Sequence, residues 1–258
     1  MNKLIIAASR IAIIIFIIYG LGCAGLYMFP GSLIYFPQPR IGLPDEKALK
    51  LPISEGDVLV TTRPRSGKNA IVYFGGNAEN VSLNFADFSS AFPNYALYLL
   101  HYRGFGGSAG KPTEAGLISD ALALFDKVYA EHKQVIIIGR SLGSGIAVQV
   151  ASSRPVAKLV LVTPYNSILE MAGTRFPYVP VSWLLKDKYE SWRYAPMIDI
   201  PVLILAAESD SLIPREQTVL LHSHLKPNIV SFKILPNTSH NTISESSLYL
   251  PSIEEFCK

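Results

Sequence analysis

Apolar runs of strand length alternate with helix-period stretches along most of this chain. Seven runs of branched and aromatic residues are typical of strands buried on both faces: 58–61, 70–74, 96–101, 134–138, 159–162, 202–206 and 229–235. Stretches with the 3.6-residue period of helices follow several of them, at 113–131, 141–152 and 215–224. This alternation predicts an α/β fold with a mostly parallel, doubly wound sheet, which would bind its ligand at the carboxyl ends of the strands.

The start of the chain follows a different pattern. Residues 11–29 read IAIIIFIIYGLGCAGLYMF without a charge, long enough as a helix to cross a hydrocarbon core of about 30 Å. Lys3 and Arg10 precede this run, so the positive-inside rule favours a cytoplasmic N-terminus and an extracytoplasmic domain. A cleaved signal peptide would have a shorter apolar region. Lipid modification of Cys23 is a further alternative, although Gly20 stands where such signals usually carry leucine. We expect one uncleaved transmembrane helix.

Composition agrees with a single domain behind an anchor. The chain has 258 residues, 49% hydrophobic and 17% charged, and its mean hydropathy of +0.28 reflects the apolar run. We divide it into a basic flank (1–10), an anchor (11–29), a proline-rich extended linker (30–52) and a soluble domain (53–258) with an insertion at 164–200. The net charge of +3 comes from scattered basic residues, which indicates no nucleic-acid partner. Two cysteines build neither a disulfide scaffold nor a metal cluster.

A serine lies between glycines where the fourth predicted strand meets a helix. The segment VIIIGRSLGSG, residues 135–145, places Gly139 and Gly143 two positions either side of Ser141. Small residues are needed there because the serine backbone of a nucleophile elbow is strained and the flanking chains pass close together. The helix that follows would direct its free N–H groups at an oxyanion. A phosphate-binding loop is disfavoured, since neither G-x-G-x-x-G nor a following lysine is present.

A serine nucleophile requires a base and a carboxylate that orients it. In α/β-hydrolases the order along the chain is serine, acid, histidine. His240 lies just beyond the last predicted strand, whereas His101 ends a strand but precedes the serine. Asp210 follows a strand in the turn before a proline-initiated helix, and Glu208 is its competitor. The sequence therefore predicts Ser141, Asp210 and His240 as a catalytic triad.

Two backbone N–H groups are candidates for the oxyanion hole. The first belongs to Leu142, directly after the serine. The second lies in the loop after the strand IVYF, where Gly75 and Gly76 let the chain approach a substrate and Asn77 is the candidate donor.

The insertion at 164–200 is expected to cover the site as a cap, and it is rich in aromatic residues: Tyr165, Phe176, Tyr178, Trp183, Trp192 and Tyr194. These rings indicate an apolar acyl or aryl pocket, with Tyr165 and Trp183 as candidate substrate contacts. The alternative is that they only pack the cap onto the core, because large aromatic side chains dominate buried surfaces generally.

Seven motifs occur in order along the chain: SLIYFPQP, YFGGNAEN, HYRGFGGSAGKPTEAGL, GRSLGSG, TPYNSI, ESDSLIP and SHN. Together they resemble the α/β-hydrolase superfamily and, within it, the Bem46-like group related to the membrane-associated ABHD13- and ABHD17-type proteins. The resemblance begins near Ser32 and runs to the carboxyl end. It implies the same triad, the same two oxyanion donors, and no metal or organic cofactor. The chain departs from the group at Gly75, where relatives typically have histidine, and at His101, where they typically have aspartate.

The resemblance and the ordered motifs lead to one expected function. We expect a membrane-anchored serine hydrolase that cleaves esters or thioesters with lipid-like acyl groups, acting as a monomer whose partners are the acyl substrate and the membrane. A serine peptidase of the same fold would use the same machinery. A non-catalytic, membrane-tethered scaffold is the alternative from a different class, because fold alone does not imply function.

Overall fold

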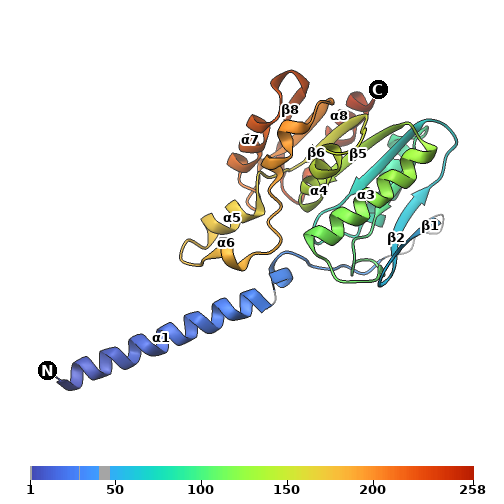
Figure 1. The fold of residues 1–258 in the computed structure, drawn as a ribbon. Helices are drawn as coiled ribbons and strands as arrows, with labels where there is room; N and C mark the ends of the chain where they lie inside the picture. The colour runs from blue at the N-terminus through green and yellow to red at the C-terminus, as the bar shows by residue number, and fades with distance from the viewer. Residues whose placement is uncertain (1, 29, 41–46) are drawn as a thin grey trace.

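An eight-stranded sheet forms the centre of the computed structural model, which describes residues 2–28, 30–40 and 47–258 (Figure 1). Its strands are β1 (Lys47–Ile53), β2 (Gly56–Arg63), β3 (Asn69–Phe74), β4 (Ala96–Leu100), β5 (Gln134–Arg140), β6 (Lys158–Val162), β7 (Val202–Ser209) and β8 (Val230–Ser239). The order across the sheet is β1-β2-β4-β3-β5-β6-β7-β8. Only the pairs β1/β2 and β2/β4 are antiparallel, so the predicted mostly parallel sheet is confirmed.

Helices cover both faces of this sheet. On one face, α3 (Glu114–Glu131), α4 (Leu142–Ala151) and α7 (Arg215–His224) pack on one set of alternating strand side chains. On the other, α2 (Phe85–Ala91) and α8 (Tyr249–Cys257) pack on the second set. A doubly wound arrangement follows because each central strand is apolar on both sides and needs cover on both. Thr113 caps α3 as its sequence suggests, its hydroxyl accepting from the Gly116 N–H.

The predicted linker is shorter than its sequence suggests. Lys47–Ile53 forms edge strand β1, antiparallel to β2, instead of an extended tether. Leu51 is buried while Lys50 and Pro52 are exposed, and an edge strand tolerates a proline because one side of it makes no ladder hydrogen bonds. Ile34 and Tyr35 of the same segment are buried in the core. Positions 41–46 of the linker and Phe29 of the predicted anchor lie outside the described residues.

The N-terminal helix α1 (Asn2–Met28) projects away from the sheet (Figure 1). Its segment Ile5–Met28 is long and apolar enough to cross a membrane, and the most apolar window within it has no buried residue. Between β6 and β7 the predicted insertion contains α5 (Ile168–Arg175) and α6 (Val181–Leu184), which lie beside the carboxyl-terminal part of α1 (Figure 1). We call residues 164–200 the cap.

Candidate active site

The serine of the GRSLG motif lies at a strained corner between β5 and α4. Ser141 has φ 51° and ψ −118°, a conformation that is rare for a residue with a side chain. A Cβ at Gly143 would collide with the Phe74 carbonyl, and one at Gly139 would lie 2.5 Å from the Gly143 carbonyl oxygen. The two glycines are therefore required by close backbone contacts, and the corner presents the serine at the carboxyl edge of the sheet.

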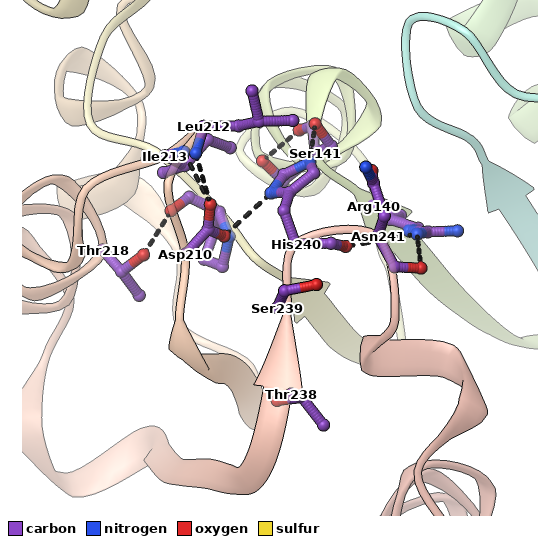
Figure 2. A network of polar contacts seen from close by, with 12 residues as sticks. Arg140, Ser141, Asp210, Leu212, Ile213, Thr218, Thr238, Ser239, His240 and Asn241 are labelled. Atoms are coloured by element: carbon purple, nitrogen blue, oxygen red, sulfur yellow. Dashed lines mark hydrogen bonds and ion pairs between the residues drawn. The ribbon is translucent and has the colours of Figure 1, made fainter.

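The structure brings together the three residues predicted as the triad. His240 Nε2 lies 3.0 Å from Ser141 Oγ, and His240 Nδ1 lies 2.8 Å from Asp210 Oδ2. Figure 2 shows the imidazole between the hydroxyl and the carboxylate. The side chains of His240 and Asp210 are only 10% and 6% exposed, so the pair is largely removed from water. This is the geometry in which a carboxylate orients a histidine towards a hydroxyl.

Backbone N–H groups hold Asp210 in place. Its Oδ1 accepts hydrogen bonds from Leu212 N (3.0 Å) and Ile213 N (2.7 Å), which leaves Oδ2 for the histidine (Figure 2). The competitor Glu208 is exposed and accepts instead from the Asn237 N–H at 2.7 Å. The turn between β7 and α7 thus brings the aspartate, and not the glutamate, to the histidine.

The two candidate oxyanion donors flank the serine. Leu142 is the first residue of α4, where a backbone N–H has no partner within the helix. Asn77 lies in the loop after β3, and both residues line the same cavity as Ser141. The Asn77 side-chain amide donates to the Ile34 carbonyl at 2.9 Å, and the Asn77 backbone carbonyl accepts from Phe36 N at 3.1 Å. The segment after α1 therefore fixes the position of this loop.

An ion pair that sequence reasoning did not foresee connects the loops of the site. Glu79 accepts from Gly76 N at 2.6 Å and from the Tyr73 hydroxyl at 2.7 Å. Its Oε2 also lies 3.7 Å from Nη1 of Arg140, the residue before the serine. Arg140 Nη2 donates to the carbonyls of His240 and Asn241, at 3.3 and 3.4 Å (Figure 2). Arg140, whose role the sequence leaves unexplained, thus joins the oxyanion loop, the elbow and the histidine loop.

The electrostatics of this cluster favour its charged form. Burial by itself lowers the pKa of Arg140, but the Glu79 carboxylate raises it, and the net pKa lies above the ordinary guanidinium value. Burial, followed by the Glu79 charge, raises the pKa of Tyr73 well above that of a free tyrosine. The tyrosine therefore stays a neutral donor to Glu79. No sequence signal marks Glu79, because nothing local shows that its partner lies 61 positions later.

His101, one of the two departures from the group pattern, is a buried core residue 2% exposed. Its Nε2 lies 2.8 Å from Thr61 Oγ1, and Gly106 approaches the ring so closely that a Cβ there would collide with Nδ1. It does not line the cavity at Ser141. At the other departure, the Gly75 carbonyl accepts from the Tyr102 hydroxyl at 2.8 Å, so a core tyrosine contacts this loop where relatives place a histidine.

A cavity of about 240 Å³ opens onto the serine, and the structure separates the two candidate substrate contacts. Tyr165 lines it, with its hydroxyl donating to the Leu142 carbonyl at 3.2 Å. Trp183 does not line it and is 82% exposed on α6, so the structure does not place this candidate substrate contact at the serine. The half-buried side chains of α6 are Val181 and Leu184. Among the described residues, no group of three or more His, Cys, Asp or Glu side chains has the arrangement of a metal site.

Comparison with known proteins gives the family of this chain. The family profile described as "Serine aminopeptidase, S33" matches residues 68–196. The uncharacterized protein Rv2307c of Mycobacterium tuberculosis is 30% identical over 265 residues, which cover 93% of this chain and 92% of that protein. Protein bem46 of Schizosaccharomyces pombe is 27% identical, covering 90% and 86%. The solved structure of the Pyrococcus furiosus esterase Pf2001 superposes with a TM-score of 0.70 at 17% identity, over 86% of this chain and 96% of that one.

A profile match over half of the chain, with a relative 30% identical along nearly its whole length, defines the class. The chain belongs to the α/β-hydrolase family. Within that family it is a Bem46-like protein, as its ordered motifs predicted.

Proposed function

We propose that this protein is a membrane-anchored serine hydrolase that cleaves carboxylic esters or thioesters through an acyl-enzyme, acting as a monomer. The observation that carries the proposal is the hydrogen-bonded series Ser141, His240 and Asp210, at 3.0 and 2.8 Å, on a strained elbow. A scaffold protein would have no need to keep a serine at φ 51°, since such strain is stored mainly at functional sites.

The residues have distinct roles in the proposed reaction. His240 Nε2 accepts the proton of Ser141 Oγ as the oxygen attacks the carbonyl carbon, and the Leu142 and Asn77 N–H groups stabilise the oxyanion. Asp210 orients the imidazole and stabilises its protonated form. The imidazolium then donates its proton to the leaving alkoxide or thiolate. Water, deprotonated by His240, attacks the acyl-enzyme and releases a carboxylic acid and free Ser141.

The lining of the cavity favours acyl substrates over peptides. Most of its wall is aliphatic, with Ile168, Met171, Leu212 and Ile213 facing the serine. An aminopeptidase must bind the ammonium group of its substrate, usually with a carboxylate, and no described carboxylate lines this cavity. The description of the matched family profile keeps peptide hydrolysis as the second candidate.

The first test replaces the nucleophile. Ser141→Ala is expected to abolish labelling by a fluorophosphonate probe and to lower kcat for p-nitrophenyl esters about 10³-fold or more. Ser223→Ala, an exposed serine on α7, serves as the control and should behave as the wild type. Labelling that persists in Ser141→Ala would refute the assignment. Turnover of an aminoacyl-p-nitroanilide but of no ester or thioester would favour the peptidase, and turnover of neither would favour the scaffold.

A second proposal concerns location. We propose that α1 spans a membrane with its N-terminus in the cytoplasm and the hydrolase domain on the other side, on the basis of Lys3 and Arg10 near the N-terminus. Glu216→Cys places an exposed thiol on α7, whereas Cys257 is buried. A membrane-impermeant maleimide added to intact cells should label this variant but not the wild type. Labelling that requires permeabilisation would reverse the orientation.

A further inference from the structure

A second hollow, of about 190 Å³, lies between the cap and the carboxyl-terminal part of α1. All of its described lining residues are apolar. They come from three separate segments: Leu26 from α1, Leu33 and Ile34 from the turn after it, and Ala172, Phe176 and Leu184 from the cap, among others. We call this hollow the anchor–cap groove. A groove with this lining offers no hydrogen-bonding partner and suits only an apolar occupant.

The anchor–cap groove adjoins the cavity at the serine. Leu33, Ile34 and Ile168 line both spaces, so the two are separated by no more than these shared side chains. This shared wall is apolar, and the groove on its other side extends to Leu26 of the anchor helix. Its position next to the reaction site distinguishes the groove from an ordinary apolar surface patch.

The groove lies beside the apolar span of α1 and not beyond the end of that span. The Tyr19 hydroxyl of α1 donates to the Tyr178 carbonyl of the cap at 2.7 Å. Tyr19 precedes the end of α1 at Met28 by about nine residues, or roughly 13 Å of helix rise. Three aromatic side chains of the cap are exposed: Phe176, Tyr178 and Trp183. If α1 spans a bilayer, Tyr19 lies near the middle of the span Ile5–Met28, so this edge of the cap lies at the depth of the acyl chains.

Buried hydrogen bonds hold the segment after α1 against the cap. The Tyr35 hydroxyl donates to Asp187 Oδ2 at 3.0 Å and lies 2.9 Å from the Tyr189 hydroxyl, which therefore acts as the donor between the two. Asp187 Oδ1 accepts from the Glu114 N–H at the start of α3, and Glu114 in turn accepts from the Tyr189 N–H. These contacts fix the wall formed by Leu33 and Ile34, so the groove is a defined part of the fold.

We propose that the anchor–cap groove binds the long acyl chain of the substrate, which reaches Ser141 directly from the bilayer. The inference rests on the proposed ester or thioester hydrolysis. The chemistry recognised is a long saturated acyl group on oxygen or sulfur, held by Leu26 on the anchor side and by Ala172 and Phe176 on the cap side. The anchor helix is thus part of the substrate site and not only a tether.

The test compares long and short acyl chains in the full-length protein reconstituted in phosphatidylcholine vesicles. Ala172→Phe fills the groove, and Ala172 itself does not line the serine cavity. It should lower kcat/KM for p-nitrophenyl palmitate about tenfold or more and leave p-nitrophenyl butyrate within about twofold. Thr174→Phe, which places the same ring on an exposed position of α5, is the matched control and should change neither value.

A second pair of variants tests the other wall, in case Ala172→Phe does not fold. Leu26→Trp should obstruct the groove from the anchor, whereas Leu21→Trp, at a position 67% exposed on the same helix, should not. If kcat/KM falls equally for the palmitate and butyrate esters, or falls no more than in the controls, the proposed role of the groove would be overturned. Absence of butyrate turnover and of fluorophosphonate labelling in the wild type would instead overturn the proposed function itself.

The source of the acyl chain is resolved in the same vesicles. One arm carries a diacyl phospholipid as the acyl donor and the other an S-palmitoyl peptide, and release of palmitate is measured in each. Release from either donor that is lowered by Ala172→Phe but not by Thr174→Phe supports the groove and identifies the donor. Release from neither, in a preparation that hydrolyses p-nitrophenyl palmitate, would overturn access from the bilayer.

Discussion

Glu79 illustrates how one carboxylate positions several parts of a reaction site. It accepts from the Gly76 N–H next to the oxyanion candidate Asn77 and pairs with Arg140 next to the nucleophile. Its side chain and that of Arg140 are 13% and 14% exposed. The formation of an ion pair so little exposed adds little net stability. The removal of one partner is nevertheless strongly destabilising, because it leaves the other charge buried without compensation.

Replacement of Glu79 should therefore affect both folding and rate. We expect Glu79→Ala to lower the free energy of unfolding by about 2–4 kcal/mol. We also expect kcat to fall by about tenfold or more with a smaller change in KM, since the loop that carries an oxyanion donor loses its support. Denaturant unfolding and steady-state kinetics on p-nitrophenyl butyrate measure the two effects.

Glu79→Gln separates positioning from charge. Its amide oxygen still accepts from the Gly76 N–H, so part of kcat should return even though the ion pair with Arg140 is lost. Glu255→Ala removes the carboxylate of an exposed pair with Lys233 and is the control, expected to leave both properties unchanged. A Glu79→Ala enzyme with wild-type kcat would show that the loop needs no such support.

At the scale of elements, the corner between β5 and α4 depends on close backbone packing. The Ser141 N–H donates to the Val162 carbonyl of β6 at 2.9 Å, which ties the corner to the neighbouring strand. Gly143 lets the first turn of α4 lie directly on the end of β3. The strain at the serine is therefore maintained by the elements around it and not by the corner alone.

The addition of a single methyl group at this corner should destabilise the protein strongly. We expect Gly143→Ala to lower the free energy of unfolding by about 3 kcal/mol or more or to prevent folding, because its Cβ would meet the backbone of Phe74 and Gly75, which cannot rotate away. Gly173→Ala on α5 is the matched control. Nothing lies within 4 Å of a Cβ added at this position, and the higher helix propensity of alanine should stabilise the protein by about 0.5–1 kcal/mol. Thermal unfolding followed by circular dichroism measures both, and equal melting temperatures would contradict the packing argument.

At the scale of the whole molecule, α1 and the exposed edge of the cap lie on the same side of the domain (Figure 1). Lys186 Nζ lies 4.6 Å from the centre of the Tyr27 ring, which adds a cation–π contact between cap and anchor. Apolar and aromatic surface thus gathers around the helix that is apolar enough to cross a membrane, while α7 and α8 lie away from it (Figure 1).

This arrangement predicts that Trp183 contacts lipid. The chain has two tryptophans, so Trp192→Phe leaves Trp183 as the sole reporter. In vesicles of brominated phosphatidylcholine we expect strong quenching of its fluorescence relative to unbrominated vesicles, because a ring beside the apolar span lies within reach of acyl bromines. The reverse variant, Trp183→Phe, reports from the half-buried Trp192 and should be quenched much less. Equal quenching of the two would place the cap away from the bilayer.

Much of the fold was predictable because its signals are local. Each buried strand is a short apolar run, and all seven predicted strands are present. Strand β1 was missed because its two lysines and its proline resemble a linker, and only pairing with β2 makes this segment a strand. The short helices of the cap gave no periodic signal strong enough to place them.

The candidate site also has parts that local sequence predicts and parts that it does not. The sequence by itself determined the triad candidates, because each member has a local signal: a strand–turn–helix corner with glycines at fixed spacing for the serine, and the end of a later strand for the acid and for the histidine. Their order along the chain then matched the order known for this fold. Only the tertiary structure decided that Glu79 pairs with Arg140, that Trp183 points outward and Tyr165 inward, and that Leu26 and Ala172 form one groove. Those contacts join segments far apart along the chain, and the packing that selects them depends on the folded shape of every element between them.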